Sequence, residues 1–233
     1  MDYLKEYNEK QSSNNRNFIK QFILDHLNRR WKSKGQDSLK AVYFNRVLKA
    51  TEINIETTEI SILEVGGGNG DFMRYFHPNI KRKVMIDIDP FYQEEFKSMG
   101  IEFYCKDISK EKLNQVNDSC IDIIMLNHLI EHIGDIFFFM NEIKRVMKSN
   151  GMIYIRTPDI KKVKYSFYDD FTHIRPFSKN GLKHMMTTFG FKEIVTISSD
   201  NSTLKLEEYF NTKLGFFAFL GAKEIETIWK KEQ

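Results

Sequence analysis

The amino-acid sequence predicts an α/β fold, a doubly wound Rossmann-like sheet with helices on both faces. Three observations lead to this prediction. From Ile60 onward, short apolar runs alternate with stretches of helical periodicity, the pattern of parallel βαβ units. A glycine-rich turn, Gly66–Gly70, follows the first apolar run and opens a helix. The last two apolar runs have no convincing helix between them, which indicates an antiparallel pair at one sheet edge.

Five short apolar runs are expected to form the parallel strands: Ile60–Val65, Val84–Ile88, Ile101–Cys105, Ile121–Asn127 and Met152–Arg156. Helices are expected between them at Asp71–Phe76, Phe91–Ser98 and Ile136–Lys148. Ser149-Asn150-Gly151 is interpreted as the stop of the last of these helices. The basic run Lys81-Arg82-Lys83 is interpreted as the solvated entrance to the second strand.

The carboxyl-terminal third is expected to complete the sheet. A long loop from Asp159 to Pro176 precedes a helix that Ser178 caps and that ends near Phe189. Strands are then expected at Phe191–Ser199 and Glu224–Lys230. The apolar run Leu214–Leu220 is expected to be core rather than interface, and the oligomeric state stays open.

The amino-terminal residues are expected to form a helical cap on the same domain. Apolar residues recur at helical spacing in Phe18–Trp31 and again in Ser38–Ala50. Residues 1–55 are therefore predicted to be this cap, and residues 56–233 the main domain.

Composition excludes several classes of protein. The chain has 233 residues, of which 41% are hydrophobic and 29% charged, as in soluble globular proteins. A net charge of +3 is too small to favour a nucleic-acid partner. Cys105 and Cys120 show no metal or disulfide spacing. No signal peptide and no membrane-length apolar run is visible, so a cytoplasmic location is expected.

The glycine turn has the features of a nucleotide-type cofactor site. Glycines allow a sharp turn and let a ligand approach the backbone closely. Asp87 lies about twenty residues later, at the end of the second strand, where an acceptor for ribose hydroxyls belongs. A dinucleotide site has G-x-G-x-x-G spacing, whereas here Glu64 precedes Gly66-x-Gly68-x-Gly70. A carboxylate at Glu64 suits a ligand ammonium group better than a pyrophosphate, which favours S-adenosylmethionine.

An ordered set of motifs resembles the class I S-adenosylmethionine-dependent methyltransferases over about residues 60–200. Ile62–Gly70 looks like motif I of that family, and Arg145–Gly151 is similar to its R-x-L-K-P-G-G turn, with Ser149 and Asn150 replacing Pro and Gly. The resemblance implies strand order 3-2-1-4-5-7-6 with strand 7 antiparallel. It also implies an enzyme with S-adenosylmethionine as cofactor. The cofactor-binding residues that it implies are Glu64, Gly66, Gly67, Gly68, Asp87, Ile88, Asp107, Ile108 and Asn127.

Three histidines are candidates for the acceptor side of the site. His128 and His132 follow the fourth strand and flank Glu131, and His173 lies in the loop after the fifth strand. Parallel strands place their carboxyl ends at one edge of a sheet, so these imidazoles are expected to converge. One hypothesis makes His128, His132 or His173 the general base that takes a proton from the acceptor.

Two other hypotheses for these histidines stay open. Glu131 and His132 could merely brace the next helix. Alternatively, His128, Glu131, His132 and His173 could bind a metal, with His128 and His132 one helical turn apart. That set resembles the E-x-x-E-H plus distant His arrangement of small-RNA 2′-O-methyltransferases and some ubiquinone-pathway O-methyltransferases. His128 replaces the first Glu of that arrangement, which favours Zn²⁺ or no metal over Mg²⁺.

The loop from Asp170 to Ser178 also resembles a segment of bacterial methyltransferases of surface polysaccharide and nucleotide-sugar pathways. Arg175 would then meet a phosphate of an activated sugar, or else form an ion pair with Asp169 or Asp170. The predicted function is methyl transfer to O or N of a small polar acceptor, such as a sugar or nucleotide-linked sugar of polysaccharide biosynthesis. The rivals are metal-assisted methylation of an RNA 2′-hydroxyl or a catechol, and a non-catalytic S-adenosylmethionine-binding protein.

Overall fold

The computed structural model describes residues 46–51, 53–68, 70, 72–73, 79–200, 213, 216 and 220–232. The chain divides into two units, Met1–Asp37 and Ser38–Gln233, and every described residue belongs to the second. Residues 46–51 are helical, in agreement with the end of the predicted second helix. The predicted helix Phe18–Trp31 and most of Ser38–Ala50 and Asp71–Phe76 lie outside the described residues. The boundary between a cap and a main domain at residue 55 stays a prediction.

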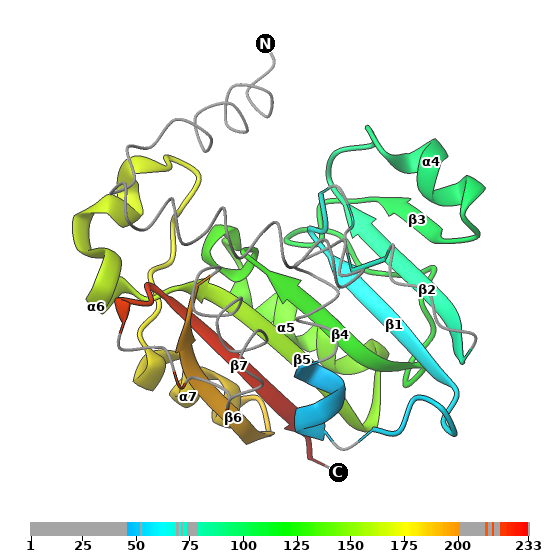
Figure 1. Ribbon diagram of the computed structural model, residues 1–233. Helices are drawn as coiled ribbons and strands as arrows, with labels where there is room; N and C mark the ends of the chain where they lie inside the picture. Colours follow the sequence, from blue (N-terminus) through cyan, green and yellow to red (C-terminus); the bar gives the residue numbers. More distant parts are fainter. Residues whose placement is uncertain are drawn as a thin grey trace, which may run out of the picture. The chain divides into compact units, whose positions relative to one another are not determined.

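A seven-stranded sheet in the order β3-β2-β1-β4-β5-β7-β6 forms the centre of the second unit (Figure 1). Strands β1 to β5 pair in parallel, whereas β7 is antiparallel to both β5 and β6. The predicted topology is therefore confirmed. The strands are β1 (Ile60–Val65), β2 (Ile80–Asp87), β3 (Glu102–Cys105), β4 (Ile121–Asn127), β5 (Met147–Pro158), β6 (Phe191–Ser199) and β7 (Glu224–Lys231).

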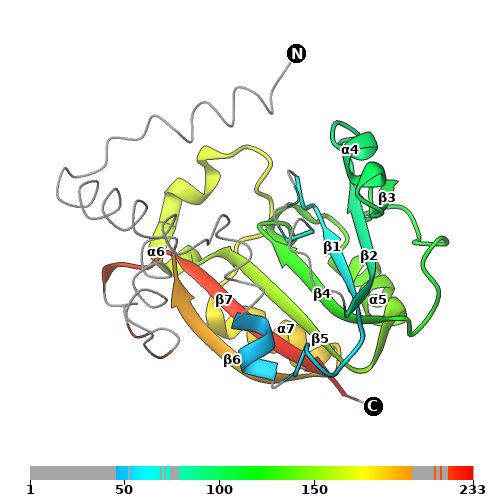
Figure 2. The same cartoon turned by 45° about the vertical axis from the view of Figure 1, so that its right-hand side comes forward.

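The helices between these strands are α4 (Gln93–Ser98), η1 (Ile130–His132), α5 (Ile136–Val146), α6 (Ile160–Val163), η2 (Lys164–Asp169) and α7 (Lys179–Thr188), where η marks a 3-10 helix. Helices α4, α5 and α7 lie where helices were predicted, whereas η1, α6 and η2 were not predicted. Helices α5 and α7 lie on the same face of the sheet, where Phe139, Ile143 and Met186 join its core (Figure 2). No helix in the described part of the chain has the length and apolar character needed to cross a bilayer.

The second strand begins earlier than predicted. It starts at Ile80, so Lys81-Arg82-Lys83 lies inside β2; Lys81 is exposed as predicted, whereas Arg82 and Lys83 are half-buried. Arg82 donates two hydrogen bonds of 2.8 Å to the carboxylate of Glu102 on the neighbouring strand, and Lys83 donates to the carbonyl of Met73. Basic residues can therefore lie inside this strand because groups on other elements pair with them, although the basic composition of the run suggested a loop.

The junction between α5 and β5 also differs from the prediction. The helix ends at Val146, and β5 starts directly at Met147. Ser149-Asn150-Gly151 is thus no helix stop but an irregular part of the strand, in which Asn150 has a φ of 63°. The register shows the cause, because Met147 pairs with Ile121 and the next paired residue, Met152, pairs with Ile123.

The predicted loop from Asp159 to Pro176 contains α6 and η2, so that prediction is wrong in part. Asp159 caps α6 by accepting a hydrogen bond of 3.0 Å from the backbone of Lys161. The predicted cap of α7 is confirmed, since Ser178 accepts from the backbone of Gly181. Most of Leu214–Leu220 lies outside the described residues. Its described members Phe216 and Leu220 are 57% and 49% exposed, so the core prediction is wrong for these two.

Candidate active site

The glycine turn lies at the carboxyl end of β1, where the chain adopts left-handed conformations. Gly66 and Gly68 have φ values of 66° and 55°. A Cβ on Gly67 would lie 2.7 Å from Cδ of the fully buried Glu64, so the loop packs directly on that carboxylate. A Cβ on Gly68 would meet no atom within 4 Å and would project into open space. The turn therefore has the form of a cradle that glycine leaves open.

The end of β2 holds this cradle in place. The backbone N–H of Gly68 donates a 2.9 Å hydrogen bond to Oδ2 of Asp87. The other oxygen of Asp87 accepts from the backbone of Asp89, at 2.9 Å. Asp89 accepts in turn from the backbone of Phe91 at 3.0 Å, so it caps the following turn, as its position beside Pro90 indicates. Asp87 thus joins the glycine turn to the second strand and keeps further lone pairs for a ligand.

The remaining predicted cofactor residues fall into two groups. Ile88 is 68% exposed beside Asp87, and the buried side-chain oxygen of Asn127 has no hydrogen-bond partner among the described residues. Ile108, in contrast, is only 4% exposed and belongs to the main core. The carboxylate of Asp107 accepts hydrogen bonds from Lys110 and Ser109. These hydrogen bonds lower the pKa of the carboxyl more than burial raises it, so this pKa lies below the usual range.

His128 lies between two carboxylates. Its Nδ1 is 3.3 Å from Oε1 of Glu131, and its Nε2 is 3.5 Å from Oε1 of Glu224 on β7. Glu224 is also paired with Arg156 on β5. Burial opposes the imidazolium charge, but Glu224 and Glu131 outweigh it and raise the pKa of His128 to about 9. His128 therefore stays protonated at neutral pH, which makes it a poor general base.

The predicted helical spacing of His128 and His132 is wrong. His128 precedes η1 and has a φ of 52°, so the two residues do not share one helix face. From this left-handed turn the His128 ring reaches Glu224 on β7, whereas His132 belongs to η1.

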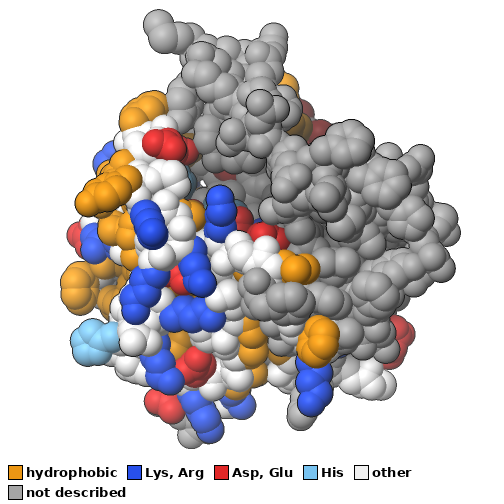
Figure 3. Space-filling model, turned by 60° about the vertical axis from the view of Figure 1, so that its left-hand side comes forward, with side chains coloured by type: hydrophobic (Ala, Val, Ile, Leu, Met, Phe, Trp, Pro, Cys, Tyr) orange, Lys and Arg blue, Asp and Glu red, His pale blue; other side chains and the backbone are white. Residues whose placement is uncertain are grey.

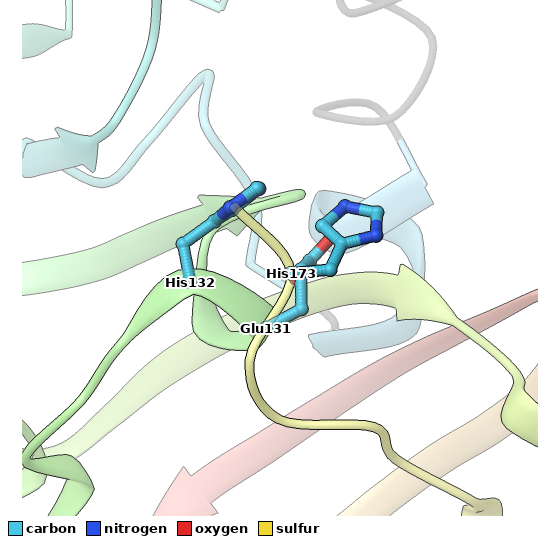
Figure 4. A group of neighbouring side chains, drawn as sticks. All are labelled: Glu131, His132 and His173. Atoms are coloured by element: carbon cyan, nitrogen blue, oxygen red, sulfur yellow. The ribbon is translucent and has the colours of Figure 1, made fainter. Parts of the chain in front are cut away.

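His132 and His173 come together as predicted, although they are 41 residues apart (Figure 4). Their ring centroids are 4.7 Å apart. His132 Nδ1 lies 3.1 Å from the carbonyl oxygen of Thr172, and His173 Nδ1 lies 2.7 Å from that of Phe167. Because a carbonyl can only accept, each Nδ1 carries a hydrogen, and Nε2 is the proton-accepting atom of each neutral ring.

Glu131 connects these parts. Its side chain is fully buried, and Oε2 accepts a 2.9 Å hydrogen bond from the hydroxyl of Thr157. Its backbone carbonyl accepts from the N–H groups of Ile174 and Arg175, both at 3.0 Å. Glu131 therefore holds His128, β5 and the loop of His173 together. It also offers one potential metal ligand, as do His132 and His173, with all three atoms within 4.8 Å of one another.

Sequence reasoning missed three supporting residues. Thr157 and Glu224 lie on strands far from the histidines along the chain, so no local pattern marks them. Thr172 places its hydroxyl 3.0 Å from His132 Nδ1 and donates to Asp170 at 2.6 Å. The spacing Asp170-x-Thr172 is typical of a side chain that caps its own turn, a signal that could have been used.

Of the two alternatives for Arg175, the ion pair is wrong. Within the described residues, its guanidinium forms no ion pair with Asp169 or Asp170 and donates instead to the carbonyl of Gly134 at 3.0 Å. It thus attaches the loop after β5 to the segment after η1.

Comparison with known proteins supports a methyltransferase fold. No curated protein matches the sequence. A solved methyltransferase from Archaeoglobus fulgidus, described as SAM dependent, is 20% identical with a TM-score of 0.56, over 82% of this chain and 94% of that one. An S-adenosylmethionine-dependent methyltransferase from Mesorhizobium loti is 10% identical with a TM-score of 0.60, over 76% and 93%. One from Clostridium acetobutylicum is 13% identical with a TM-score of 0.59, over 83% and 91%.

A family model assigns the chain more directly. The model described as a methyltransferase domain matches residues 17–196, which include β1 to β5, the glycine turn and all three candidate histidines. The chain therefore belongs to the methyltransferase domain family.

Proposed function

We propose that this protein transfers a methyl group from S-adenosylmethionine to an O or N atom of a small polar acceptor. The observation that carries the proposal is that a glycine turn and a pair of imidazoles both lie at the carboxyl edge of one sheet. The glycine turn with Asp87 follows β1 and β2, and the paired imidazoles of His132 and His173 follow β4 and β5. Ligands of open α/β sheets bind at this edge. Membership of the methyltransferase family supports an enzyme over a non-catalytic binding protein.

The residues of the turn fit this cofactor. Gly68 leaves open the space into which any side chain would project. Among the described residues, the buried side-chain oxygen of Asn127 has no hydrogen-bond donor, so a donor of the cofactor can bind it. Asp87 offers lone pairs to ribose hydroxyls, and Glu64 brings a negative charge beneath the turn. The segment from Asp107 to Ile108, after β3, would border the adenine. When bound, S-adenosylmethionine supplies a methyl group activated by a sulfonium charge.

The chain's own residues then position the acceptor and move one proton. Nε2 of His132 or His173 accepts the proton that the acceptor hydroxyl or amine loses as its bond to the methyl carbon forms. Thr172 and the carbonyl of Phe167 fix the ring orientations, so that no rotation is needed at this step. His128 stays charged and, together with Arg156, balances the charges of Glu131 and Glu224.

The finer proposal is that the acceptor is a sugar or a nucleotide-linked sugar of surface polysaccharide synthesis. The resemblance of the loop Asp170–Ser178 to methyltransferases of those pathways supports it. Arg175 does not add to this support, because its guanidinium already binds the carbonyl of Gly134. A panel of nucleotide sugars, assayed for S-adenosylhomocysteine release, tests this point. Release with catechols or RNA but with none of the sugars would contradict it.

Calorimetry with S-adenosylhomocysteine tests the cofactor. Asp87→Asn is expected to weaken binding by about tenfold or more, since a charge-assisted hydrogen bond is lost. Asp89→Asn is the matched control, because that residue lies two positions away and caps a turn. No binding to the unmodified protein, or equal losses in both variants, would contradict the proposal.

A second candidate is metal-assisted methylation of a hydroxyl. The observation that favours it is the convergence of Glu131, His132 and His173 within 4.8 Å. His128 is not part of this group, since its ring binds Glu224. Protein prepared without a histidine tag should then hold about one Zn²⁺ per chain, lost in His173→Gln. A metal-free protein with full methyl transfer would exclude this candidate.

A further inference from the structure

The segment after β5 presents aromatic side chains to solvent at unusual density. Tyr165 is 89% exposed, Phe171 76% and Tyr168 57%, and Ile174, three residues after Phe171, is 55% exposed. Large apolar side chains gathered within ten residues on a surface mark an interaction site more often than scattered ones do. The proposed methyltransferase chemistry uses none of these four side chains.

Lysines accompany the aromatic side chains. Lys161, Lys162 and Lys164 are on α6 and at the start of η2, and all three are exposed. In the part of the chain that the structure describes, no ion pair neutralises any of these three lysines. Figure 3 shows Lys and Arg side chains beside hydrophobic ones on the face where α6 and α7 come forward. We call the six side chains Lys161, Lys162, Lys164, Tyr165, Tyr168 and Phe171 the aromatic–lysine surface.

We propose that the aromatic–lysine surface binds the headgroup region of an anionic lipid bilayer. Tyrosine and phenylalanine partition into the boundary between headgroups and acyl chains, where one side of the ring is apolar and the other wet. Lysines beside them are attracted by the negative surface potential of anionic lipids. This inference goes beyond the proposed function and does not depend on it.

Two other partners fit this surface less well. A protein partner favours arginine and depletes lysine at the centre of an interface, whereas here three exposed lysines precede the aromatic residues within one short segment. Specific nucleic-acid binding draws on many phosphate contacts and on arginine forks, and Lys161, Lys162 and Lys164 are only three point charges. A bilayer needs no such fixed geometry, because its headgroups adapt to scattered cations.

The position of the surface gives such binding a consequence for catalysis. Thr172 and His173 follow Phe171 directly, so the same segment carries the aromatic side chains and one of the paired imidazoles. Contact with a bilayer would therefore bring the acceptor side of the site close to the membrane surface.

Vesicle flotation of the full chain tests the proposal. We expect the protein to float with vesicles of phosphatidylcholine containing about a third phosphatidylglycerol, and not with phosphatidylcholine alone. The triple variant Lys161→Gln, Lys162→Gln, Lys164→Gln should bind about a hundredfold more weakly, at about fivefold for each lysine.

A matched triple variant controls for net charge. Lys81→Gln, Lys97→Gln and Lys112→Gln remove the same charge near β2 and β3, at the opposite end of the sheet from β6. This control should bind within about twofold of the unmodified protein. Equal losses in both triple variants would overturn the proposal, as would vesicle binding that neither variant changes. Binding of single-stranded RNA, but not of vesicles, that depends on Lys161, Lys162 and Lys164 would also overturn it.

A tryptophan at position 165 tests insertion directly. Tyr165→Trp fluorescence should shift to the blue and be quenched by bromine-labelled anionic lipids, since the ring enters the headgroup boundary. Phe137→Trp is the control, because Phe137 is 65% exposed on α5, outside the aromatic–lysine surface. Equal quenching of the tryptophans introduced by Tyr165→Trp and Phe137→Trp would contradict the assignment of the surface.

Discussion

The cofactor side and the acceptor side of the sheet edge are held by different means. At the ends of β1 and β2, the backbone forms most of the site: glycines turn the chain, and Asp87 accepts N–H groups of Gly68 and Asp89. At the ends of β4, β5 and β7, a network of four charged side chains and one threonine, three of them fully or almost fully buried, holds the site. Its members are His128, Glu131, Arg156, Thr157 and Glu224.

This difference predicts how each side responds to change. A backbone cradle tolerates most substitutions except those that add a side chain or remove one of its two carboxylates, Glu64 and Asp87. A buried charge network responds to the loss of any member, because the remaining charge is left without its partner. Substitutions on the acceptor side should therefore reduce stability and turnover, and those on the cofactor side should reduce affinity.

The largest expected effect is on turnover, in His132→Gln and His173→Gln. Replacing the ring that serves as base should lower kcat by about a hundredfold to ten-thousandfold, because the proton acceptor is lost. Single-turnover methyl transfer measures this effect. His128→Gln is the comparison, and a kcat loss confined to His128→Gln would show that its raised pKa does not prevent a base role.

Next in size is the effect of Glu131→Gln on stability. This change removes the buried charge beside His128 and is expected to lower the free energy of unfolding by about 3 kcal/mol. The corresponding loss in Tm is about 6–12 °C for a chain of this size. Calorimetry measures this loss. The affinity of the folded variant for S-adenosylhomocysteine should stay within about twofold of that of the unmodified protein. An unchanged Tm would mean that the network does not hold the acceptor side.

Gly68→Ala should also lower stability, but on the cofactor side of the site. The left-handed backbone at Gly68 makes any Cβ strained, by about 1–2 kcal/mol, and this Cβ would enter the space left for the cofactor. Gly100→Ala is a close match, since Gly100 also has a positive φ and open space around it but lies between α4 and β3. Both should lose similar stability, and only Gly68→Ala should weaken S-adenosylhomocysteine binding, by about tenfold. Equal affinity in the two variants would contradict the cradle.

The smallest expected effect is the pH dependence of stability. Since the pKa of His128 is raised from 6.5 to about 9 on folding, its contribution is complete below pH 6.5 and is lost as pH rises through 9. Burial alone would raise the pKa of Glu224, but Arg156 and His128 outweigh it and lower this pKa from 4.5 to about 2, so its contribution is lost as pH falls through that range. The alkaline loss should be about 1 kcal/mol after solvent screening, and His128→Gln should remove it. Urea unfolding at a series of pH values measures both the acid loss from Glu224 and the alkaline loss from His128.

Sequence alone identified the cofactor side more completely than the acceptor side. Glycines and acids at strand ends are local signals, and Asp87 lies where the pattern of loop and second strand indicates. The parallel βαβ units and the antiparallel pair β6–β7 could be predicted from local patterns, whereas the full strand order followed from the family resemblance.

The acceptor side could be predicted only in part. His132 and His173 converge, as the shared strand edge implies. The role of His128 could not be foreseen, because it depends on Glu224, which is 96 residues away and reaches it only through the crossover to β7. Arg175 and Lys83 likewise bind backbone carbonyls, which no side-chain pattern announces.

Hydrogen exchange with and without S-adenosylhomocysteine locates the cofactor site directly. We expect slower exchange in the ligand complex at the glycine turn 64–70, at residues 87–89 and 105–109, and near Asn127, with β6 and α7 unchanged. Protection confined to β6, β7 or α7, or no protection at saturating ligand, would contradict a cofactor site at the carboxyl ends of β1, β2, β3 and β4.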